Sequence, residues 1–527
     1  MSRTENIKRN LIFNMIKFAT QLILQFVLRT VLIYFMGSQY VGISGLYTNI
    51  FSFLNLAELG IGGAIVFSMY KPIADGDVEK VKALQQLYKK LYLIIFFVVL
   101  GVGGLITPFV EFLIKDAGSI NINIYITYAI YLVNTLVGYF SAHKRSLLFA
   151  YQRNDVENKI RTICILAMTA VQILVIVLTK NYYIFAITNV VFTLLEGVLI
   201  YLVANKLFPE INGKAEPIDS VTKKEISKNV FALSAHKFGG VVVNSTDNVI
   251  ISAFLGLSVL GAYSNYTLIL TSLTSFFMLL YNALTSSVGN LMATTDENYC
   301  YEKFKVVNFI FSYLASFTTI CLVCLFQPFV KYWTHGGEYL LGFGTMILLC
   351  VQHYVSRMRT SVFVFKDAAG LFWQDRWKPV VEAVINLVVS IVLVIWLGID
   401  GVIIGTIVST ICAPLWVEPC VLYKYYFKRK PKYYFLKYLL DAVIMCAVSA
   451  VCYLVCSFIP DASLWWLILK FLTAIVLSNI LLILIYFKTR EFQDAYALAK
   501  KMLHKMRKKY TEPIPATQNE EASKTDL

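Results

Sequence analysis

Long apolar runs follow one another along almost the whole chain, and this succession constrains the fold more than any other feature. A helix needs about 20 predominantly apolar residues to cross a bilayer, and most of the runs reach that length. Hydrophobic residues make up 58% of the chain and charged residues only 15%, which excludes an ordinary soluble globular protein. We therefore predict an all-α polytopic membrane protein with about 14 transmembrane helices, at 11–36, 41–70, 91–114, 122–142, 162–179, 184–204, 229–256, 263–290, 306–327, 342–366, 381–398, 401–422, 438–458 and 465–487.

The basic residues are distributed unevenly between the two ends of these predicted helices. Most of the 47 Lys and Arg lie in segments on the same side of the membrane as the N-terminus, whereas the opposite loops contain only Lys115, Lys180 and Lys331. Cytoplasmic loops carry such an excess, so we expect a multi-pass protein with both termini in the cytoplasm. The net charge of +15 thus reflects topology, and nucleic acid is not an expected partner.

An internal repeat relates two parts of the chain at an offset of 219 residues. The matching residues are Phe35, Gly37, Gly42, Tyr47 and Thr48 in the first part and Phe254, Gly256, Gly261, Tyr266 and Thr267 in the second. Because an even number of spans precedes the second part, we predict two parallel six-helix repeats that form a central cavity. The expected domains are an N-terminal half at 1–206, a cytoplasmic linker at 207–228, a C-terminal half at 229–424, two peripheral C-terminal helices at 425–487, and a cytoplasmic tail at 488–527 that is basic and then disordered.

Polar residues in the first apolar run fall on one helical face. Asn10, Asn14, Lys17, Gln21, Gln25 and Arg29 are separated by three or four residues, which is the period of one face of an α-helix. In a spanning helix this face must contact protein or water, so we predict that it lines an aqueous cavity. Hydrogen bonding between helices is the alternative. The two charges favour the cavity, because each costs at least ~2.5 kcal/mol in the membrane interior unless it is hydrated or paired.

Three further predicted helices have similar polar faces. These faces comprise Ser44, Thr48, Ser52, Asn55 and Glu58 in 41–70, Asn229, His236, Gly240, Asn244 and Asp247 in 229–256, and Ser264, Thr267, Thr271 and Asn282 in 263–290. Together with the first helix, they predict one polar interior lined by two helices from each half.

Charged residues are expected near both ends of this interior. At 1.5 Å per residue, Arg29 and Asp247 lie ~12 and ~14 Å below the outer turns and are therefore level with each other. They are predicted either to latch the outer mouth or to form a structural ion pair. Lys17, His236 and Lys237 lie near the inner mouth, where they suit an anionic headgroup or alternatively extend to lipid phosphates.

Three more charged residues have two interpretations each. Glu58 is expected either to neutralise the nearby lysine or bind a coupling cation, or to be a buried structural partner. Arg357 and Arg359 point about 200° apart around one predicted helix, so both cannot face the cavity centrally. Arginine suits bidentate phosphate contacts, so at least one is a candidate for substrate binding. Structural pairing with Glu382 or Glu196 is the competing account.

Motifs near the N-terminus resemble those of a known family. They are Arg9-Asn10, the turn Val41-Gly42-Ile43-Ser44-Gly45-Leu46-Tyr47, the segment Asn55-Leu56-Ala57-Glu58-Leu59-Gly60-Ile61-Gly62, and Ser68-Met69-Tyr70-Lys71-Pro72. They are similar to bacterial polysaccharide flippases of the Wzx type, in the multidrug/oligosaccharidyl-lipid/polysaccharide exporter superfamily. The resemblance covers nearly the whole chain but is distinctive only over the first 90 residues.

This resemblance implies a flippase rather than an enzyme, located in the bacterial cytoplasmic membrane. It implies translocation of an undecaprenyl-diphosphate-linked oligosaccharide from the inner to the outer leaflet by alternating access. The implied partners are this lipid-linked oligosaccharide, membrane lipids, and possible associated enzymes, namely a polysaccharide polymerase and glycosyltransferases. Coupling to H⁺ or Na⁺ stays open at this point, as does the absence of coupling, with Asp247, Glu58 and His236 as the titratable candidates.

Two other functional classes are alternatives to the flippase. A membrane glycan polymerase or ligase needs a sizeable outer catalytic loop, and the longest expected one, Pro328–Leu341, has no paired carboxylates and no nucleophile near a base. A multidrug exporter of the same superfamily should present acidic and aromatic residues to cations, whereas the predicted cavity is basic. The ten cysteines lie almost entirely in apolar runs without suitably spaced histidines, so no metal or other cofactor is expected.

Overall fold

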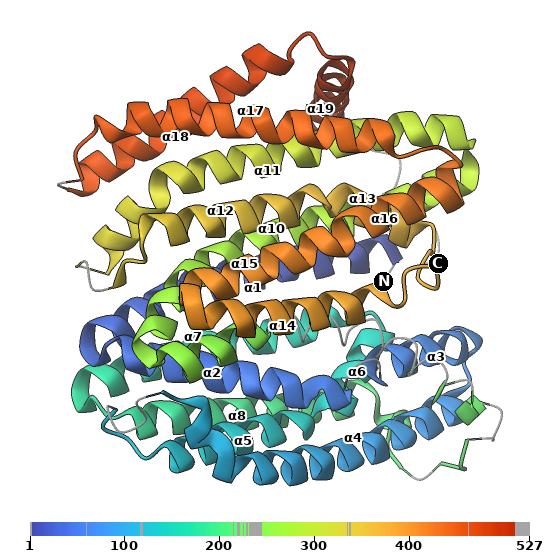
Figure 1. Cartoon of the computed structure of the whole chain (residues 1–527). Coiled ribbons are helices and arrows are strands. Elements are labelled where there is room, and N and C mark those ends of the chain that lie inside the picture. The colour runs from blue at the N-terminus through green and yellow to red at the C-terminus, as the bar shows by residue number, and fades with distance from the viewer. Residues whose placement is uncertain are drawn as a thin grey trace.

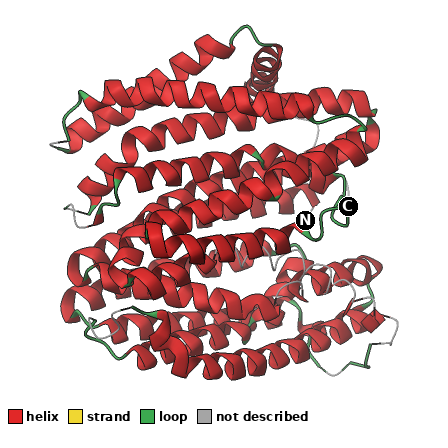
Figure 2. Ribbon diagram, viewed as in Figure 1, coloured by secondary structure: helices red, strands yellow, loops and turns green. Residues whose placement is uncertain are grey.

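The computed structural model describes residues 3–58, 61–115, 120–213, 215–218, 222–224, 226–227, 230, 245–334, 336, 339–461 and 463–511. Over these ranges the chain is helical and has no β-strand, as Figure 2 shows. Eleven of the described helices are long and apolar enough to cross a membrane. The predicted all-α polytopic membrane fold is therefore confirmed.

The N-terminal half is a bundle in which α1 and α5 each pack against the pair formed by α7 and α8 (Figure 1). Its elements are α1 (Arg3–Met36), α2 (Ser38–Leu54), the 3₁₀ turn η1 (Asn55–Glu58), α3 (Ile61–Asp75), α4 (Val78–Ile106), η2 (Thr107–Leu113), α5 (Ile124–Tyr139), α6 (Ala142–Ala150), α7 (Asn154–Thr179), α8 (Tyr182–Leu207) and η4 (Pro209–Ile211). α1 contacts α7, α7 contacts α8, and α8 contacts α5, so these four helices pack in that order.

The C-terminal half repeats this plan with different helix breaks. Residues 245–255 are helical, and they are followed by α10 (Leu257–Thr294), α11 (Glu297–Trp333), α12 (Phe343–Met358), α13 (Thr360–Ala368), α14 (Lys378–Leu397), α15 (Ile399–Cys412), α16 (Pro414–Leu422) and the π-helical turn η6 (Tyr423–Phe427). α14 packs against α15 as α7 packs against α8, and α10 packs against α13.

Several of the predicted spans are not single long helices among the described residues. The span at 91–114 passes from α4 into η2, and the span at 401–422 divides at Ala413 into α15 and α16. The span at 41–70 divides into α2, η1 and α3, and the span at 342–366 divides at Arg359. At these last two breaks, polar side chains form hydrogen bonds within the protein, which compensates for the interrupted backbone pattern. The span at 229–256 is described from residue 245 onward.

The two halves meet in a reciprocal contact between α2 and α10. A methyl group at Gly42 would lie 2.2 Å from the carbonyl oxygen of Leu257, and one at Gly261 would lie 2.2 Å from the carbonyl oxygen of Ser38. The offset of 219 residues relates Gly42 to Gly261 and also relates Ser38 to Leu257. Equivalent residues thus exchange equivalent contacts, as expected for two units related by a two-fold axis.

The turns that lead into α2 and α10 also match. Gly37 and Gly256 have φ angles of 96° and 91°, a region that favours glycine because it has no Cβ. Both residues precede the first residue of a helix, and their backbone N–H groups donate hydrogen bonds to carbonyl oxygens at the end of the preceding helical segment. At this junction the predicted parallel repeat therefore corresponds to two helix–turn–helix units with equivalent turns and contacts. The predicted limits of the linker at 207–228 stay predictions.

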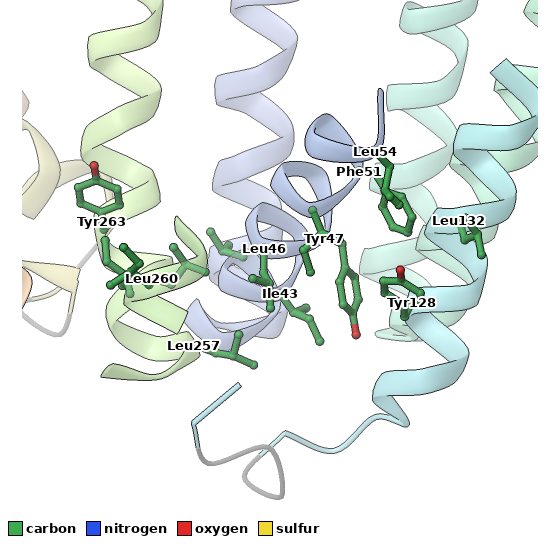
Figure 3. Close-up of a cluster of buried hydrophobic side chains, with 14 of the residues drawn as sticks. Ile43, Leu46, Tyr47, Phe51, Leu54, Tyr128, Leu132, Leu257, Leu260 and Tyr263 are labelled. Atoms are coloured by element: carbon green, nitrogen blue, oxygen red, sulfur yellow. The ribbon is translucent and has the colours of Figure 1, made fainter. Parts of the chain in front are cut away.

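A buried apolar cluster stabilises this junction (Figure 3). Ile43 and Leu46 of α2 are fully buried, as is Leu260 of α10. Leu257 extends toward α2 from the first turn of α10, and Tyr128 of α5 packs beside Tyr47 with ring centroids 5.8 Å apart. The halves are thus closed together at the end of the bundle opposite the N-terminus of α1.

The last helices pack on the flank of the C-terminal half. α17 (Lys432–Ser457) and α18 (Leu464–Tyr486) contact each other and α11, and α19 (Arg490–Thr511) also contacts α11. Figure 1 shows this group at the edge of the bundle farthest from the N-terminal half. This arrangement agrees with the prediction that two C-terminal helices are peripheral.

Candidate functional site

The polar face of α1 lies inside the N-terminal half. Together with α7 and α8 it encloses a cavity of about 270 Å³. The polar residues that line this cavity are Gln21 and Gln25 of α1, Arg161 and Thr169 of α7, and Asn189, Thr193 and Glu196 of α8. The sequence predicted one polar interior shared by both halves, and the structure corrects this because α1 turns its polar face toward its own half.

Charged residues gather at the end of this cavity nearest the N-terminus. Lys17 Nζ lies 3.9 Å from Glu157 Oε2, and Arg161 Nη1 lies 3.7 Å from Glu157 Oε1. Arg145 Nη2 donates to Glu196 Oε1 at 2.7 Å. Three cations therefore face two carboxylates, which leaves the group with a net positive charge. Beside it, the half-exposed end of α1 is joined to α7 by a 3.4 Å hydrogen bond from Asn158 to Asn14.

Four of these charged residues were not predicted as site residues, namely Arg145, Glu157, Arg161 and Glu196. Arg145, Glu157 and Arg161 fall in the stretch that reads as a cytoplasmic connection before the run at 162–179. α7 begins earlier, at Asn154, and carries Asp155 and Glu157 in its first turn. Acidic residues favour a helix N-terminus, and this is the signal by which the earlier start could have been found.

Arg29 lies on the same face of α1, one helical turn beyond Gln25. Its Nη1 atom is buried without a hydrogen-bond partner, and no carboxylate among the described residues forms an ion pair with it. The side chain lies beside Tyr131 and Tyr182, with which it interacts electrostatically. These two hydroxyls are 3.0 Å apart, and Tyr182 also shares a 2.6 Å hydrogen bond with Ser44.

Asp247 lies in the C-terminal half and not beside Arg29. Its side chain is buried and accepts a 2.9 Å hydrogen bond from Thr406 Oγ1, which in turn accepts one of 2.9 Å from Asn386. The predicted ion pair between Arg29 and Asp247 is therefore wrong, because each side chain is directed into its own half. Asp247 Oδ1 and Asn386 Oδ1 are buried and have no hydrogen-bond partner.

Other oxygen atoms complete this group in the C-terminal half. Ser390 Oγ and Thr406 Oγ1 each lie 3.3 Å from the carbonyl oxygen of Val402. A carboxylate, an amide oxygen, two hydroxyls and a backbone carbonyl are thus linked on residues 245–255, α14 and α15. Such hard oxygen donors suit a small cation such as Na⁺.

Glu58 and Asn55 are held by tyrosines of the N-terminal half. Tyr92 donates a hydrogen bond to Glu58, and Tyr139 donates one of 2.5 Å to Asn55. Tyr88 in turn donates to Tyr92 at 3.0 Å. These contacts fit the structural alternative for Glu58. The carboxylate beside Lys17 is that of Glu157, and not that of Glu58.

The two arginines of the C-terminal half differ in their contacts. Arg359 donates to Glu418 at 3.1 and 3.0 Å and lies 4.0 Å from Glu382, so its guanidinium is engaged by carboxylates. This supports the structural account for Arg359. Arg357 has no carboxylate partner among the described residues, its Nε is buried without a hydrogen bond, and its Cζ lies 6.0 Å from the centre of the Phe277 ring.

The remaining predicted residues contribute less to the described site. Thr271 is exposed on α10 and its hydroxyl bonds to the carbonyl of Thr267 at 2.8 Å, within its own helix. His236, Lys237 and Asn244 lie outside the described residues.

An apolar groove lies between the two halves and the peripheral helices. Its volume is about 480 Å³, and it is lined by Phe26 of α1, Ile269 and Leu273 of α10, Phe317, Thr318, Cys321, Leu322, Leu325, Phe326 and Phe329 of α11, and Leu467, Ile468, Phe471 and Ile475 of α18. On α1, Phe26 lines this groove whereas Gln21 and Gln25 line the polar cavity, so the same helix contributes to both.

Comparisons with known proteins agree with this architecture. A family model described as a polysaccharide biosynthesis protein matches residues 7–285. The chain is similar to the lipid II flippase MurJ in an inward closed conformation, with 14% identity over 90% of this chain and 99% of that chain and a TM-score of 0.61. It is also similar to an inward-facing multidrug resistance transporter of the MATE family in the MOP superfamily, with 15% identity over 76% and 94% of the two chains and a TM-score of 0.60.

A third similar structure is the MATE transporter VcmN from Vibrio cholerae, with 12% identity over 81% of this chain and 99% of that chain and a TM-score of 0.56. At these identities the likeness concerns the fold alone. No curated protein matches the chain significantly.

Proposed function

This chain belongs to the family of polysaccharide biosynthesis proteins, as Wzx-type flippases of the MOP superfamily do, and from this premise we propose that it moves an undecaprenyl-diphosphate-linked oligosaccharide across the bacterial cytoplasmic membrane. The direction is from the inner to the outer leaflet, and both termini lie in the cytoplasm. Rocking of the two halves around the contact between α2 and α10 exposes the site alternately to each side.

The observation that carries this proposal is the guanidinium of Arg29 above the polar cavity of the N-terminal half, because its Nη1 atom is buried without a hydrogen-bond partner and no carboxylate among the described residues pairs with it. An unpaired charge in the membrane interior is costly, and an anion that enters the site removes that cost. A diphosphate also matches the donor geometry of arginine, which forms bidentate hydrogen bonds with phosphate oxygens. The net positive charge of Lys17, Arg145 and Arg161 supports entry of the diphosphate from the N-terminal end.

The apolar groove provides a place for the lipid part of the substrate. Its lining is almost entirely aliphatic and aromatic, so it can receive part of a polyprenyl chain while the headgroup occupies the polar cavity. Each buried CH₂ group contributes about 0.8 kcal/mol. The headgroup thus moves through protein, and the chain stays in an apolar environment.

We assign ion coupling to the oxygen group around Asp247. Two buried oxygen atoms there lack a partner, and a monovalent cation, Na⁺ or H⁺, would satisfy them. Transport into proteoliposomes under a Na⁺ gradient alone or a pH gradient alone distinguishes the two ions. Asp247→Asn should abolish the dependence on the coupling ion, and Asp400→Asn, also an aspartate of the C-terminal half, is the matched control. Equal ion dependence in both variants would contradict this assignment.

A cation-exporting function is the second candidate, because the MATE transporters share the fold. The charges of the N-terminal cavity argue against it, since cations outnumber carboxylates there. A polysaccharide polymerase and glycosyltransferases are proposed as the enzymes that consume and supply the substrate.

The deciding experiment follows the substrate across the membrane. Deletion of the gene should trap lipid-linked oligosaccharide in the inner leaflet, and purified protein in proteoliposomes should restore its access to a glycan-cleaving enzyme added outside. The matched control is protein with Arg29→Ala, which should restore access about tenfold to a hundredfold more slowly. Normal appearance of the oligosaccharide in the outer leaflet after deletion would refute the proposal.

A further inference from the structure

Glu157 is buried beside two cations and pairs with both by charge, but it forms a hydrogen bond with neither. Only 4% of its side chain is exposed, and its oxygens lie 3.9 Å from Lys17 and 3.7 Å from Arg161. Both distances exceed those of hydrogen bonds, and Oε2 has no hydrogen-bond partner. The neighbouring pair of Arg145 and Glu196, by contrast, is in full contact at 2.7 Å.

The two cations stay accessible while the carboxylate does not. The side chains of Lys17 and Arg161 are 22% and 37% exposed, and Arg161 lines the polar cavity. At these distances the carboxylate balances the two cations by charge, without hydrogen bonds to their N–H donors. An anion in the cavity can contact Arg161, which lines it, and Lys17, which is partly exposed, approaches the same carboxylate from α1.

We propose that Glu157 is an internal stand-in for the diphosphate of the substrate. In the empty protein it neutralises Lys17 and Arg161, and when a diphosphate enters, both cations turn to it and form hydrogen bonds that Glu157 does not make. This inference rests on the proposed function, because it assumes that the cavity receives a diphosphate.

The position of Glu157 affects the affinity for the diphosphate as well as the net charge of the site. Competition from Glu157 weakens binding of the diphosphate, and a transported ligand must bind weakly enough to leave again. When the substrate departs, the carboxylate is already in place to neutralise the two cations. Glu157 is thus a specificity-determining residue that favours an anion with more charge and more acceptors than a single carboxylate.

A structural role for Glu157 makes a different prediction. If the carboxylate only joined α1 to α7, its neutralisation would loosen the cavity and weaken anion binding. If it competes with the ligand, the same change strengthens binding. The two roles therefore predict opposite changes in the affinity for a small diphosphate when Glu157 is neutralised.

The test uses the purified full-length protein in lipid nanodiscs and inorganic pyrophosphate as the probe, with affinity measured by calorimetry. Glu157→Gln should bind pyrophosphate about tenfold more tightly than the natural chain. Glu79→Gln is the matched control, because it also removes one negative charge but from an exposed pair with Lys82, and it should leave the affinity unchanged. Unchanged or weaker binding by Glu157→Gln would overturn the inference.

Three further variants complete the test. Glu157→Asp retains the charge but shortens the side chain, so it should strengthen pyrophosphate binding less than Glu157→Gln, and it replaces that variant if Glu157→Gln does not fold. In that case, binding by Glu157→Asp that is no tighter than that of the natural chain overturns the inference. Lys17→Gln and Arg161→Gln should both weaken binding. Absence of pyrophosphate binding in the natural chain would count against the proposed function, whereas binding that depends on Lys17 but is not strengthened by Glu157→Gln would refute the stand-in alone.

Discussion

At the scale of single residues, the two cations of α1 differ in how their charge is balanced. Lys17 shares Glu157 with Arg161, whereas no carboxylate among the described residues neutralises Arg29. Both were predicted as cavity residues from their common helical face. The sequence pattern predicted that face, but it contained no information on which carboxylates would approach it, because Glu157 belongs to a helix about 140 residues away.

Arg29→Ala should lower the rate of transport by about tenfold to a hundredfold, because a hydrogen bond to a charged group contributes about 1.5–3 kcal/mol. The amount of folded protein should change little, since no hydrogen bond or ion pair among the described residues depends on this side chain. Arg29→Lys should retain only part of the activity, because lysine offers a point charge. Transport into proteoliposomes and the yield of folded protein measure the two effects, with Lys115→Ala as the control. Loss of folded protein would instead indicate a structural role.

At the scale of the helix, α1 has two faces with different surroundings. Gln21 and Gln25 line the polar cavity, and Ile23 and Val27 are exposed on the opposite, apolar face. Exposure in a spanning helix does not mean contact with water, since lipid covers apolar surface equally well. The helical period therefore predicts which residues of α1 lie on the polar face and which lie on the apolar face. The neighbouring helices determine what each face contacts.

Cysteines introduced at Gln21 and Gln25 should react with water-soluble thiol reagents, and cysteines at Ile23 and Val27 should not. The reason is that the first pair faces a polar cavity and the second pair faces lipid. The ten native cysteines are removed first, and labelling is measured in intact membranes. Equal labelling of both faces would remove the argument for an aqueous cavity in the N-terminal half.

The contact between α2 and α10 depends on the absence of a Cβ atom at Gly42. Gly42→Ala would place a methyl group against the carbonyl of Leu257. Overpacking of this kind costs about 1–3 kcal/mol, enough to shift a two-state ratio tenfold or more. We expect the halves to separate at this end, so that a cysteine at Leu260, which is fully buried, gains reactivity.

The control for this prediction is Gly138→Ala on α5, where a new methyl group meets no atom within 4 Å. It should leave the labelling of the cysteine at Leu260 unchanged. If Gly42→Ala also leaves it unchanged, the close glycine contact does not hold the halves together.

At the scale of the whole molecule, α1, α10, α11 and α18 combine to form one apolar groove. Leu467→Trp should fill part of this groove and slow transport of a substrate with a long polyprenyl chain by about tenfold, since two lost CH₂ contacts amount to about 1.6 kcal/mol. A substrate with a short isoprenoid chain should be affected less. Leu472→Trp, at an exposed position of the same helix, is the matched control, and initial rates in proteoliposomes are compared. Equal slowing of both substrates would exclude the groove as the path of the chain.

The sequence by itself determined the all-α membrane fold, the repeat and the polar face of α1. These features follow from local properties, namely the length of apolar runs, the helical period of polar residues and the equal spacing of glycine turns. The turns at Gly37 and Gly256 illustrate this, because their positions in the sequence already predicted the equivalence that their backbone angles show.

Only the tertiary structure decided which charges meet. Arg29 and Asp247 have suitable depths for an ion pair, yet α1 rotates its polar face toward α7, and Asp247 bonds to Thr406 of α15. Arg359 likewise binds Glu418, a residue from a later helix. The depth of a residue follows from its position along one helix, whereas its partners depend on how that helix is rotated against its neighbours, and this rotation is set by packing between segments far apart in the sequence.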